Sequence, residues 1–399
     1  MKYISALLAL FLILSLLTCN AATCFAAEAG SENTADSEDA LSLAAPSAIL
    51  MEADTGTILY EKNSHERLRP ASVTKIMTLL LIFEALEKGQ IHSDDTVTVS
   101  EHASEMGGSQ VYLETGETQT VNDLIKCISI ASANDAAVAM AEYIDGTEEA
   151  FVAHMNEKAK TLNMNDTTFV NCCGLEADGH LTSAHDIALM SRELSNNHPQ
   201  IHDYCTIWMD HITHTTRKGT SDFGLTNTNK LLRQYSYCTG LKTGYTSQSG
   251  FCLSATATRD HINLIAVVMA EENSKIRNKE AVSLLDYGFA HCQVYSDPLD
   301  SKLPDLTVSR GKQDSIGLAY ASPFQYVITD GSSSEEITKE LHIPDSLEAP
   351  VKKGDTVGCI EFHIGKRLLG SVDIIAKETV PAATLADCYL DCLSMLLLK

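Results

Sequence analysis

The sequence predicts a mixed α/β (α+β) fold, in which a first domain of helices and strands is followed by a small all-β domain. Three observations predict it. An apolar run after Pro70 has the length of a buried helix, three strand-like runs follow one another between residues 241 and 269, and short alternating stretches fill residues 300–378. Consecutive strands beside helices indicate a sheet with helical cover, and the later alternation favours a separate β domain.

The N-terminal end is typical of a secretory leader. Lys2 precedes an apolar run over residues 4–17, and small residues follow it. This order predicts a signal peptide over residues 1–27 and therefore export, to the extracytoplasmic face of the cell membrane or to the cell wall. A lipidated Cys19 is the less favoured alternative, because Thr18 is a poor residue immediately before a lipidated cysteine.

The first folded domain is expected over residues 45–294, after an acidic, polar stretch at 28–44 that predicts a disordered tether. Thr120 with Asp123 resembles a capping box, and Asn134 is the expected cap of a second helix. The expected elements, in chain order, are a hairpin over 48–62 that turns at Asp54-Thr55-Gly56, a helix over 72–88 closed by Gly89, two helices between 120 and 145, a mostly helical segment over 150–200, strands at 241–245, 251–258 and 262–269, and a helix over 280–290.

The C-terminal part divides into a β domain and a terminal helix. Turn-forming residues at 295–304 mark the expected boundary, and a small all-β domain is predicted over residues 300–378. Residues 382–399 alternate as an amphipathic helix that is too short and polar to span a bilayer. Peripheral contact with a membrane interface is slightly favoured over docking on the β domain, although Asp387 and Asp391 weaken that interpretation.

Composition excludes some classes of function. The chain has 399 residues, 44% of them hydrophobic, and a net charge of −24. A nucleic-acid partner is not expected, because phosphate backbones require a basic surface. No metal is expected at His211-Ile212-Thr213-His214, since no second ligand pair accompanies it, and no cofactor is predicted.

The cysteines are expected to act mainly as small buried hydrophobic residues. The chain has 12, and two of them, Cys19 and Cys24, lie in the predicted leader. The other ten show no C-x-x-C spacing, although export would permit disulfides. A bridge between Cys238 and Cys252 is the alternative left open.

Three short motifs stand in a fixed order: Ser72-Val73-Thr74-Lys75, Ser132-Ala133-Asn134 and Lys242-Thr243-Gly244. The order S-x-x-K, S-x-N, K-T-G is that of serine acyl-transfer enzymes that act on D-alanyl peptides or β-lactams. Each motif alone is weak, and S-x-x-K occurs again at Ser309-Arg310-Gly311-Lys312. The prediction therefore depends on the ordered triplet.

The residue types suit acyl transfer. Ser72 is the expected nucleophile, and Lys75 lies one turn further on the same helix face, where burial and a second cation, Lys242, would lower its pKa. Ser132 is expected to pass a proton to the leaving amine, and Asn134 to bind the substrate amide. A capped helix with a surface lysine would be the structural alternative at Ser72, but it does not explain so apolar a helix.

The third motif is expected on a strand at the rim of the site. Lys242 and Thr243 would bind a terminal carboxylate, and Gly244 would leave room for substrate beside the strand. The backbone N–H groups of Ser72 and Tyr245 would form an oxyanion hole. A plain strand with a turn at Gly244 is the structural alternative.

At these residues the chain resembles the D-alanyl-D-alanine carboxypeptidases, the low-molecular-weight penicillin-binding proteins. The resemblance extends over roughly residues 45–380. It rests on Pro70–Thr78, Ala131–Ala136, Asn171, Gly174-Leu175, His180, Ala184–Asp186, Asn227–Leu232 and Gly240–Thr246.

The resemblance implies an antiparallel sheet flanked by helices, a mostly helical subdomain carrying Ser132, and a β-rich C-terminal domain. It implies removal of the terminal D-alanine from peptidoglycan stem peptides ending in D-Ala-D-Ala, through an acyl-enzyme on Ser72, without a metal. It also implies that β-lactams acylate the same serine.

Three alternatives remain at this stage. An endopeptidase acting on cross-links would use the same chemistry. A class A β-lactamase would need a carboxylate in E-x-x-L-N, for which Glu193-Leu194-Ser195-Asn196 is only a partial match. A non-catalytic wall-binding scaffold is disfavoured because all the reacting groups are present.

Overall fold

The computed structural model describes residues 41–216, 219–297, 301–328, 331–387 and 389–390. The predicted signal peptide and residues 28–40 of the predicted tether lie outside this part. The boundary predicted after residue 44 was wrong by a few residues. Leu43 is buried in an apolar cluster, and the backbone N–H groups of Ala44 and Ala45 donate to the carboxylate of Glu280 at 2.6 and 3.0 Å. These contacts make residues 41–44 part of the folded domain.

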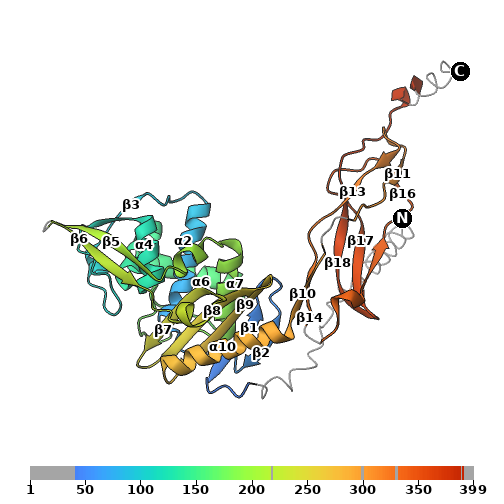
Figure 1. The fold of residues 1–399 in the computed structure, drawn as a ribbon. Helices are drawn as coiled ribbons and strands as arrows, with labels where there is room; N and C mark the ends of the chain where they lie inside the picture. Colours follow the sequence, from blue (N-terminus) through green and yellow to red (C-terminus); the bar gives the residue numbers. More distant parts are fainter. Residues whose placement is uncertain (1–40, 217–218, 298–300, 329–330, 388, 391–399) are drawn as a thin grey trace, which may run out of the picture. The chain divides into compact units, whose positions relative to one another are not determined.

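The first domain is built on a five-stranded antiparallel sheet with the order β2-β1-β9-β8-β7 (Figure 1). The predicted hairpin and the three predicted strands are all present, and the last three are longer than expected. The strands are β1 Ser47–Glu52, β2 Ile58–Lys62, β7 Cys238–Thr246, β8 Gly250–Arg259 and β9 Ile262–Glu271. Strand β7 is an edge of this sheet.

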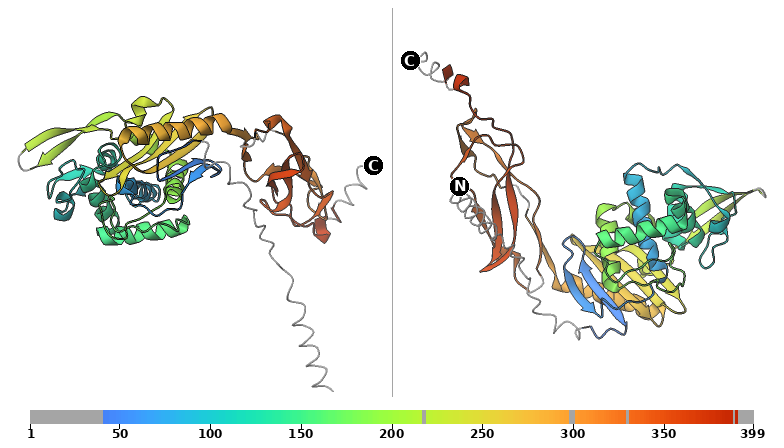
Figure 2. Two further views of the ribbon diagram at one scale, coloured as in Figure 1. Left: turned by 90° about the horizontal axis from the view of Figure 1, so that it is seen from below. Right: turned by 180° about the vertical axis from the view of Figure 1, so that it is seen from behind.

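Helices cover both faces of the sheet, which explains its continuous apolar strands (Figure 2). On β9, Ile265 and Val267 face the cluster that contains α2 (Lys75–Glu87) and α7 (Ala184–Asn197). Their neighbours Leu264 and Ala266 face α10 (Ser274–His291) instead. Successive side chains of a strand point to opposite faces, so one strand serves two cores.

The helical subdomain follows the predicted order, with differences at the helix starts. The predicted helix over 72–88 begins as a 3-10 turn, η1 Ala71–Thr74, before α2. Thr120 caps α4 as expected, because its Oγ1 accepts from the Asp123 N–H. The remaining elements of this part of the chain are β3 Thr96–Thr98, α3 Glu101–Ser104, β4 Thr118–Thr120, α4 Val121–Lys126, η2 Cys127–Ala131, α5 Asn134–Asp145, α6 Glu148–Thr161, α8 Ile201–Cys205 and α9 Leu231–Gln234.

A hairpin of β5 (Met209–Thr216) and β6 (Gly219–Thr226) was not predicted. Its residues are mostly polar and exposed, so they lack the apolar alternation that would indicate strands. His214, which belongs to the His-Ile-Thr-His segment where no metal was expected, is buried against Glu117, with 2.7 Å between its Nδ1 and the Glu117 Oε1.

The cysteine bridge between Cys238 and Cys252 is excluded by the strand register. Cys238 lies opposite Ala257, whereas Cys252 lies opposite Gly244, so the two residues are several positions apart along the paired strands. Both are free thiols, and most described cysteines are buried. The interpretation as small buried residues agrees with this.

Among the described residues of 293–384, the C-terminal part is β apart from one 3-10 turn, and residues 385–387 and 389–390 are helical. Its core contains a stacked pair of Phe324 and Phe362, with ring centroids 3.8 Å apart. The expected boundary at 295–304 lies too late, because Tyr295 on β10 already pairs with Tyr326 and packs against that ring pair. The elements are β10 Gln293–Ser296, β11 Leu306–Ser309, β12 Ser315–Ile316, β13 Leu318–Tyr320, β14 Gln325–Ile328, η3 Ser334–Glu336, β15 Ile337–His342, β16 Ser346–Glu348, β17 Thr356–Ile364 and β18 Arg367–Ala376.

The predicted terminal helix over 382–399 lies mostly outside the described residues. Of its expected apolar face, Leu385 and Tyr389 are described and are 92% and 68% exposed. In the part of the chain that the structure covers, every helix is too short or too polar to cross a bilayer.

Candidate active site

The first motif lies where the chain enters its most buried helix. Ser72 is in the 3-10 turn η1, and Lys75 begins α2, fully buried. The spacing of three residues places the Lys75 Nζ 3.1 Å from the Ser72 Oγ, to which it donates. The sequence prediction that these two side chains meet is therefore matched by the geometry.

Lys75 is held by two further acceptors. Its Nζ donates to the Asn134 Oδ1 and to the Cys173 carbonyl, both at 2.6 Å. Burial lowers the pKa of Lys75, while Cys173, Cys172 and Asp135 act in the opposite direction. The expected second cation, Lys242, is not among the groups that lower this pKa, so removal from water is the main cause.

The carbonyl of Cys173 belongs to a tight turn under the nucleophile that sequence reasoning gave no role. The Asn171 Oδ1 accepts from the N–H groups of Cys173, Gly174 and Leu175. A Cβ on Gly174 would lie 1.9 Å from the Ala71 carbonyl oxygen, and its φ is +85°. Only glycine allows this approach, which places an acceptor for Lys75 directly beside the nucleophile segment.

Ser132 occupies a strained position at the end of a π-helix. The segment Cys127–Ala131 has π-helical bonding, and Ser132 follows it with φ 62° and ψ 32°. Left-handed backbone is uncommon for a residue with a side chain, and such strain collects at functional sites. Here it directs the Ser132 Oγ toward the Lys242 Nζ, which donates to it at 2.9 Å.

Asn134 does not cap α5 as predicted, and its side chain contacts Lys75 instead. Ala133 is the cap of α5, and no side-chain bond caps the helix. The Asn134 Nδ2 donates to the Gly107 carbonyl at 2.6 Å, and its Oδ1 accepts from Lys75. Asn134 therefore holds Lys75 and the loop at Gly107, and these bonds use only one of its two Nδ2 hydrogens, so binding of the substrate amide stays a prediction.

Lys242 is the most strongly perturbed cation of the cleft. It is 1% exposed, and burial, then Lys75, then Arg277 lower its pKa well below the usual value. Its Nζ also donates to the Thr243 carbonyl at 3.1 Å. Lys75 and Lys242 thus bring two nearby ammonium sites toward two serine hydroxyls in one cleft.

The rest of the third motif lines the free edge of β7. The Thr243 Oγ1 and the Thr228 Oγ1 are 2.8 Å apart. A Cβ on Gly244 would lie 2.8 Å from the Pro70 carbonyl and 3.1 Å from the Ser72 backbone nitrogen, so glycine allows the nucleophile segment to approach β7 closely. Gly244 also lines the open cleft, and room for substrate beside it stays a prediction.

Tyr245 has its ring outside and its backbone at the strand edge. The ring is 56% exposed and stacks on Phe251, with centroids 4.2 Å apart. The Thr246 N–H donates to Ser249 inside the hairpin, at 2.8 Å. Backbone groups of a strand alternate in direction, so the Tyr245 N–H points off the free edge.

The cleft formed by these groups has a volume of about 290 Å³. It is lined by Ser72, Ser109, Ser132, Thr228, Lys230, Thr243, Gly244, Tyr245, Phe251, Ser274 and Arg277. Arg277 was not identified from the sequence. It is 4% exposed, and burial lowers its pKa to about 10, so it still carries its charge at neutral pH. Within the described residues, no group of three or more His, Cys, Asp or Glu side chains is placed to hold a metal ion.

Comparison with known proteins identifies relatives over most of the chain. The family model described as D-alanyl-D-alanine carboxypeptidase matches residues 32–273, and that of the penicillin-binding protein 5 C-terminal domain matches residues 298–382. The chain is 42% identical to the D-alanyl-D-alanine carboxypeptidase DacF of Bacillus subtilis, covering 85% of this chain and 86% of that protein. It is 32% identical to DacC of Escherichia coli, over 90% and 88% of the two chains.

Solved structures agree with this assignment. Penicillin-binding protein 5 of Haemophilus influenzae superimposes with a TM-score of 0.72 at 29% identity, over 85% of this chain and 98% of the other. The antiparallel sheet with helical cover and the separate β region, which the resemblance implied, are confirmed. The chain belongs to the D-alanyl-D-alanine carboxypeptidase family, the low-molecular-weight penicillin-binding proteins.

Proposed function

We propose that this protein is a serine-type D-Ala-D-Ala carboxypeptidase that removes the terminal D-alanine from peptidoglycan stem peptides. The observation that carries the proposal is the 3.1 Å contact between the Lys75 Nζ and the Ser72 Oγ in a cleft shared with Ser132 and Lys242. A buried amine beside a hydroxyl is the arrangement of a nucleophile with its base.

In the first step the Ser72 Oγ attacks the carbonyl carbon of the penultimate D-alanine. Lys75, neutral in the reacting form, takes the hydroxyl proton as the new C–O bond forms. The N–H groups of Ser72 and Tyr245 stabilise the oxyanion. Collapse breaks the C–N bond, and a proton delivered from Lys242 through the Ser132 hydroxyl makes D-alanine a neutral leaving amine.

In the second step water releases the acyl group. The proton of the attacking water goes to a lysine of the cleft, and the Ser72 Oγ regains its proton as the ester bond breaks. Lys75 is placed to return the proton to Ser72, because its Nζ contacts the Ser72 Oγ, and Lys242 with Ser132 is placed to accept the proton of the water. No cofactor is required by this chemistry.

Substrate binding is assigned to the rim of the cleft. The peptide lies along the free edge of β7, with its terminal carboxylate near Thr243, Lys242 and Arg277. Arg277 is suited to a carboxylate because its guanidinium is fixed by two bonds to the Asn278 Oδ1, at 3.1 and 2.9 Å. Asn134 acts by holding Lys75. β-Lactams enter the same cleft and acylate Ser72.

The site of action follows from the sequence. The leader over residues 1–27 supports export, and the substrate lies outside the cytoplasm. A peripheral membrane contact through residues 382–399 is part of the proposal, and deletion of that segment should move the protein from the membrane fraction to the soluble fraction. An unchanged distribution would exclude the contact.

Two alternative activities differ in how the structure bears on them. A DD-endopeptidase would use the same residues, and the assay below separates it by substrate. For a class A β-lactamase, the partial E-x-x-L-N match places Glu193 on α7, where its carboxylate accepts from Lys158 at 2.9 Å. Glu193 does not line the cleft, so it cannot activate the deacylating water that a class A β-lactamase requires.

The proposal is tested with a fluorescent penicillin and with release of D-alanine from a peptide ending in Lys-D-Ala-D-Ala. Ser72→Ala should abolish both signals. Ser309→Ala is the matched control, because it alters the second S-x-x-K sequence, and it should change neither. Undiminished labelling of Ser72→Ala would exclude Ser72 as the nucleophile. Cleavage of a cross-linked dimer without D-alanine release would favour the endopeptidase.

A further inference from the structure

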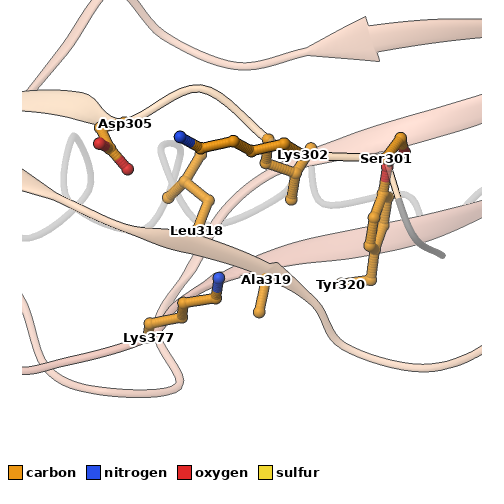
Figure 3. Close-up of a pocket in the computed structure, with 8 residues that line it drawn as sticks. Ser301, Lys302, Asp305, Leu318, Ala319, Tyr320 and Lys377 are labelled. Atoms are coloured by element: carbon orange, nitrogen blue, oxygen red, sulfur yellow. Dashed lines mark hydrogen bonds between the residues drawn. The ribbon is translucent and has the colours of Figure 1, made fainter.

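The C-terminal β region has a pocket of its own that the catalytic proposal does not use. Its volume is about 510 Å³. It is lined by Ser301, Lys302, Leu303, Asp305, Leu318, Ala319, Tyr320 and Lys377 (Figure 3). These residues come from β13, from the segment that precedes β11, and from the position directly after β18.

One wall of the pocket is a free strand edge. β13 is the end strand of the sheet β13-β18-β17-β15. The Gly317 carbonyl accepts from the Lys377 N–H, and the Ala321 N–H donates to the Asp373 carbonyl. The backbone N–H and C=O groups of the odd-numbered residues of β13 and its flanks therefore point toward β18. The backbone N–H and C=O groups of Leu318 and Tyr320 therefore point the other way, toward the pocket. Such an edge is a template for an added strand.

The charged groups of the pocket suit a ligand with carboxylates and an amine. Lys302 and Lys377 extend toward the Leu318 end from opposite sides, and Asp305 lines the same end of the pocket (Figure 3). Within the described residues, neither lysine has an ion-pair partner. Two such cations are unusual neighbours in a chain with a net charge of −24, and they would attract an anion.

The gap between these charges is kept open by a glycine. A Cβ on Gly317 would lie 3.5 Å from the Lys377 Cδ and 3.8 Å from the Asp305 Oδ1. A larger side chain there would occupy the space between the cation and the carboxylate. At the other end, Tyr320 offers an aromatic face, and its hydroxyl is fixed by a hydrogen bond with Ser301.

We propose that this pocket binds an extended anionic peptide as an added strand on β13, with ligand carboxylates at Lys302 and Lys377 and a ligand amine at Asp305. The identity of the peptide rests on the proposed function: it is a peptidoglycan stem peptide, which carries carboxylates and a diamino acid. Binding a second stem peptide would raise the local concentration of substrate around the enzyme.

The test uses the full chain and a fluorescent tetrapeptide, L-Ala-γ-D-Glu-L-Lys-D-Ala, which lacks the scissile bond. Binding is followed by anisotropy. The double variant Lys302→Ala/Lys377→Ala should lose about tenfold in affinity, the loss expected for two exposed ion pairs. Gly317→Leu keeps both lysines and fills the gap, and it should weaken binding as well. Lys366→Ala, another exposed lysine of this region, is the matched control and should bind like the unaltered protein.

Several outcomes would overturn the inference. The first is that the double variant and Gly317→Leu bind the peptide as tightly as the unaltered protein does. The second is that Lys366→Ala loses as much affinity as the double variant. The others are that a fully amidated peptide binds equally well, or that inorganic phosphate at the concentration of the peptide displaces it. Release of D-alanine from a soluble pentapeptide is measured in parallel and should be unchanged in all three variants. If the unaltered protein released no D-alanine, the proposed function would be refuted but the pocket would not, because peptide binding to the pocket is measured separately by anisotropy.

Discussion

The Ser72–Lys75 pair lies within one turn of chain, whereas the Ser132–Lys242 pair joins residues 110 positions apart. Both lysines are buried and both donate to a serine hydroxyl, yet their surroundings differ. Lys75 has two additional oxygen acceptors and lies near Asp135, while Lys242 faces Lys75 and Arg277. The same chemical pair is thus solvated by the protein in one case and exposed to cationic repulsion in the other.

This difference suggests a division of labour. A lysine with three acceptors is held in one place, as a base must be when it takes the proton of the nucleophile. A lysine surrounded by cations gives up its proton readily and suits delivery to the leaving group. Each prediction below separates these two roles.

The largest effect is expected for Lys75→Met. Without its base, Ser72 should lose about a thousandfold in the rate of acylation, since general-base catalysis contributes roughly 10²–10⁴. The measurement is the rate constant of labelling by fluorescent penicillin at saturating concentration. Lys88→Met, which changes an exposed lysine at the opposite end of the same helix, is the control. A Lys75→Met protein that labels within tenfold of the unaltered rate would assign the base to another group.

Ser132→Ala should have a smaller effect that falls on a different step. Removing the hydroxyl leaves Lys242 without its contact to the leaving group, and we expect about a hundredfold loss in D-alanine release. Penicillin labelling should fall less, because the β-lactam amine stays tethered to the acyl group. The ratio of the two rates in one protein preparation measures this, and equal losses in both would argue against the relay role.

How far these pairs could be predicted depends on their sequence separation. Ser72 and Lys75 follow from helical spacing alone, because three residues bring two side chains to one face. The contact between Ser132 and Lys242 depends on long-range tertiary packing, which no local pattern encodes. The ordered motifs predicted both residues in the cleft, but they did not predict that the two side chains touch.

Other parts of the site left no signal in the sequence. Arg277 is one basic residue on an amphipathic helix, and only the close approach of α10 to β8 brings it to the cleft. Asn134 has the composition of a cap, but tertiary contacts with Lys75 and Gly107 use its side chain instead. The β5–β6 hairpin is too polar to show alternation. The fold class could be predicted, while the long-range contacts that complete the site could not.

Two neighbouring substitutions should shift the pH dependence of acylation in opposite directions. Asn134→Asp adds a carboxylate at the Lys75 Nζ, which favours the charged form, raises the Lys75 pKa and moves the rising limb of the pH–rate profile to higher pH. Asp135→Asn removes a carboxylate that raises this pKa, so the limb should move to lower pH. Labelling rates between pH 6 and about pH 10 measure both shifts. Movement of both profiles in one direction would indicate a structural effect on the loop at Gly107.

The smallest effect concerns stability, and it separates the two lysines most directly. The folded-state pKa of Lys242 lies below its unfolded value of 10.5, so the unfolded chain binds more protons at any pH between these two values. Stability is therefore reduced at low pH and recovers as the pH rises from the folded pKa toward 10.5. Lys242→Met relieves this cost but also removes the donor to the Ser132 Oγ and the Thr243 carbonyl, so the net rise in the free energy of unfolding at pH 7 should be at most about 1 kcal/mol.

The gain in Lys242→Met should already be smaller near pH 10, because part of the unfolded lysine of the unaltered protein is then neutral, and it should vanish above 10.5. Lys75→Met should show no such gain. It leaves the Asn134 Oδ1 and the Cys173 carbonyl buried without their donor, and an unpaired buried acceptor costs about 1–3 kcal/mol. Urea unfolding of both variants at pH 7 and near pH 10 measures this. Equal stabilisation by the two substitutions would mean that the acceptors around Lys75 contribute nothing to its placement. The proposed difference between Lys75, fixed by its acceptors as the base, and Lys242, destabilised by neighbouring cations as the proton donor, would then be wrong.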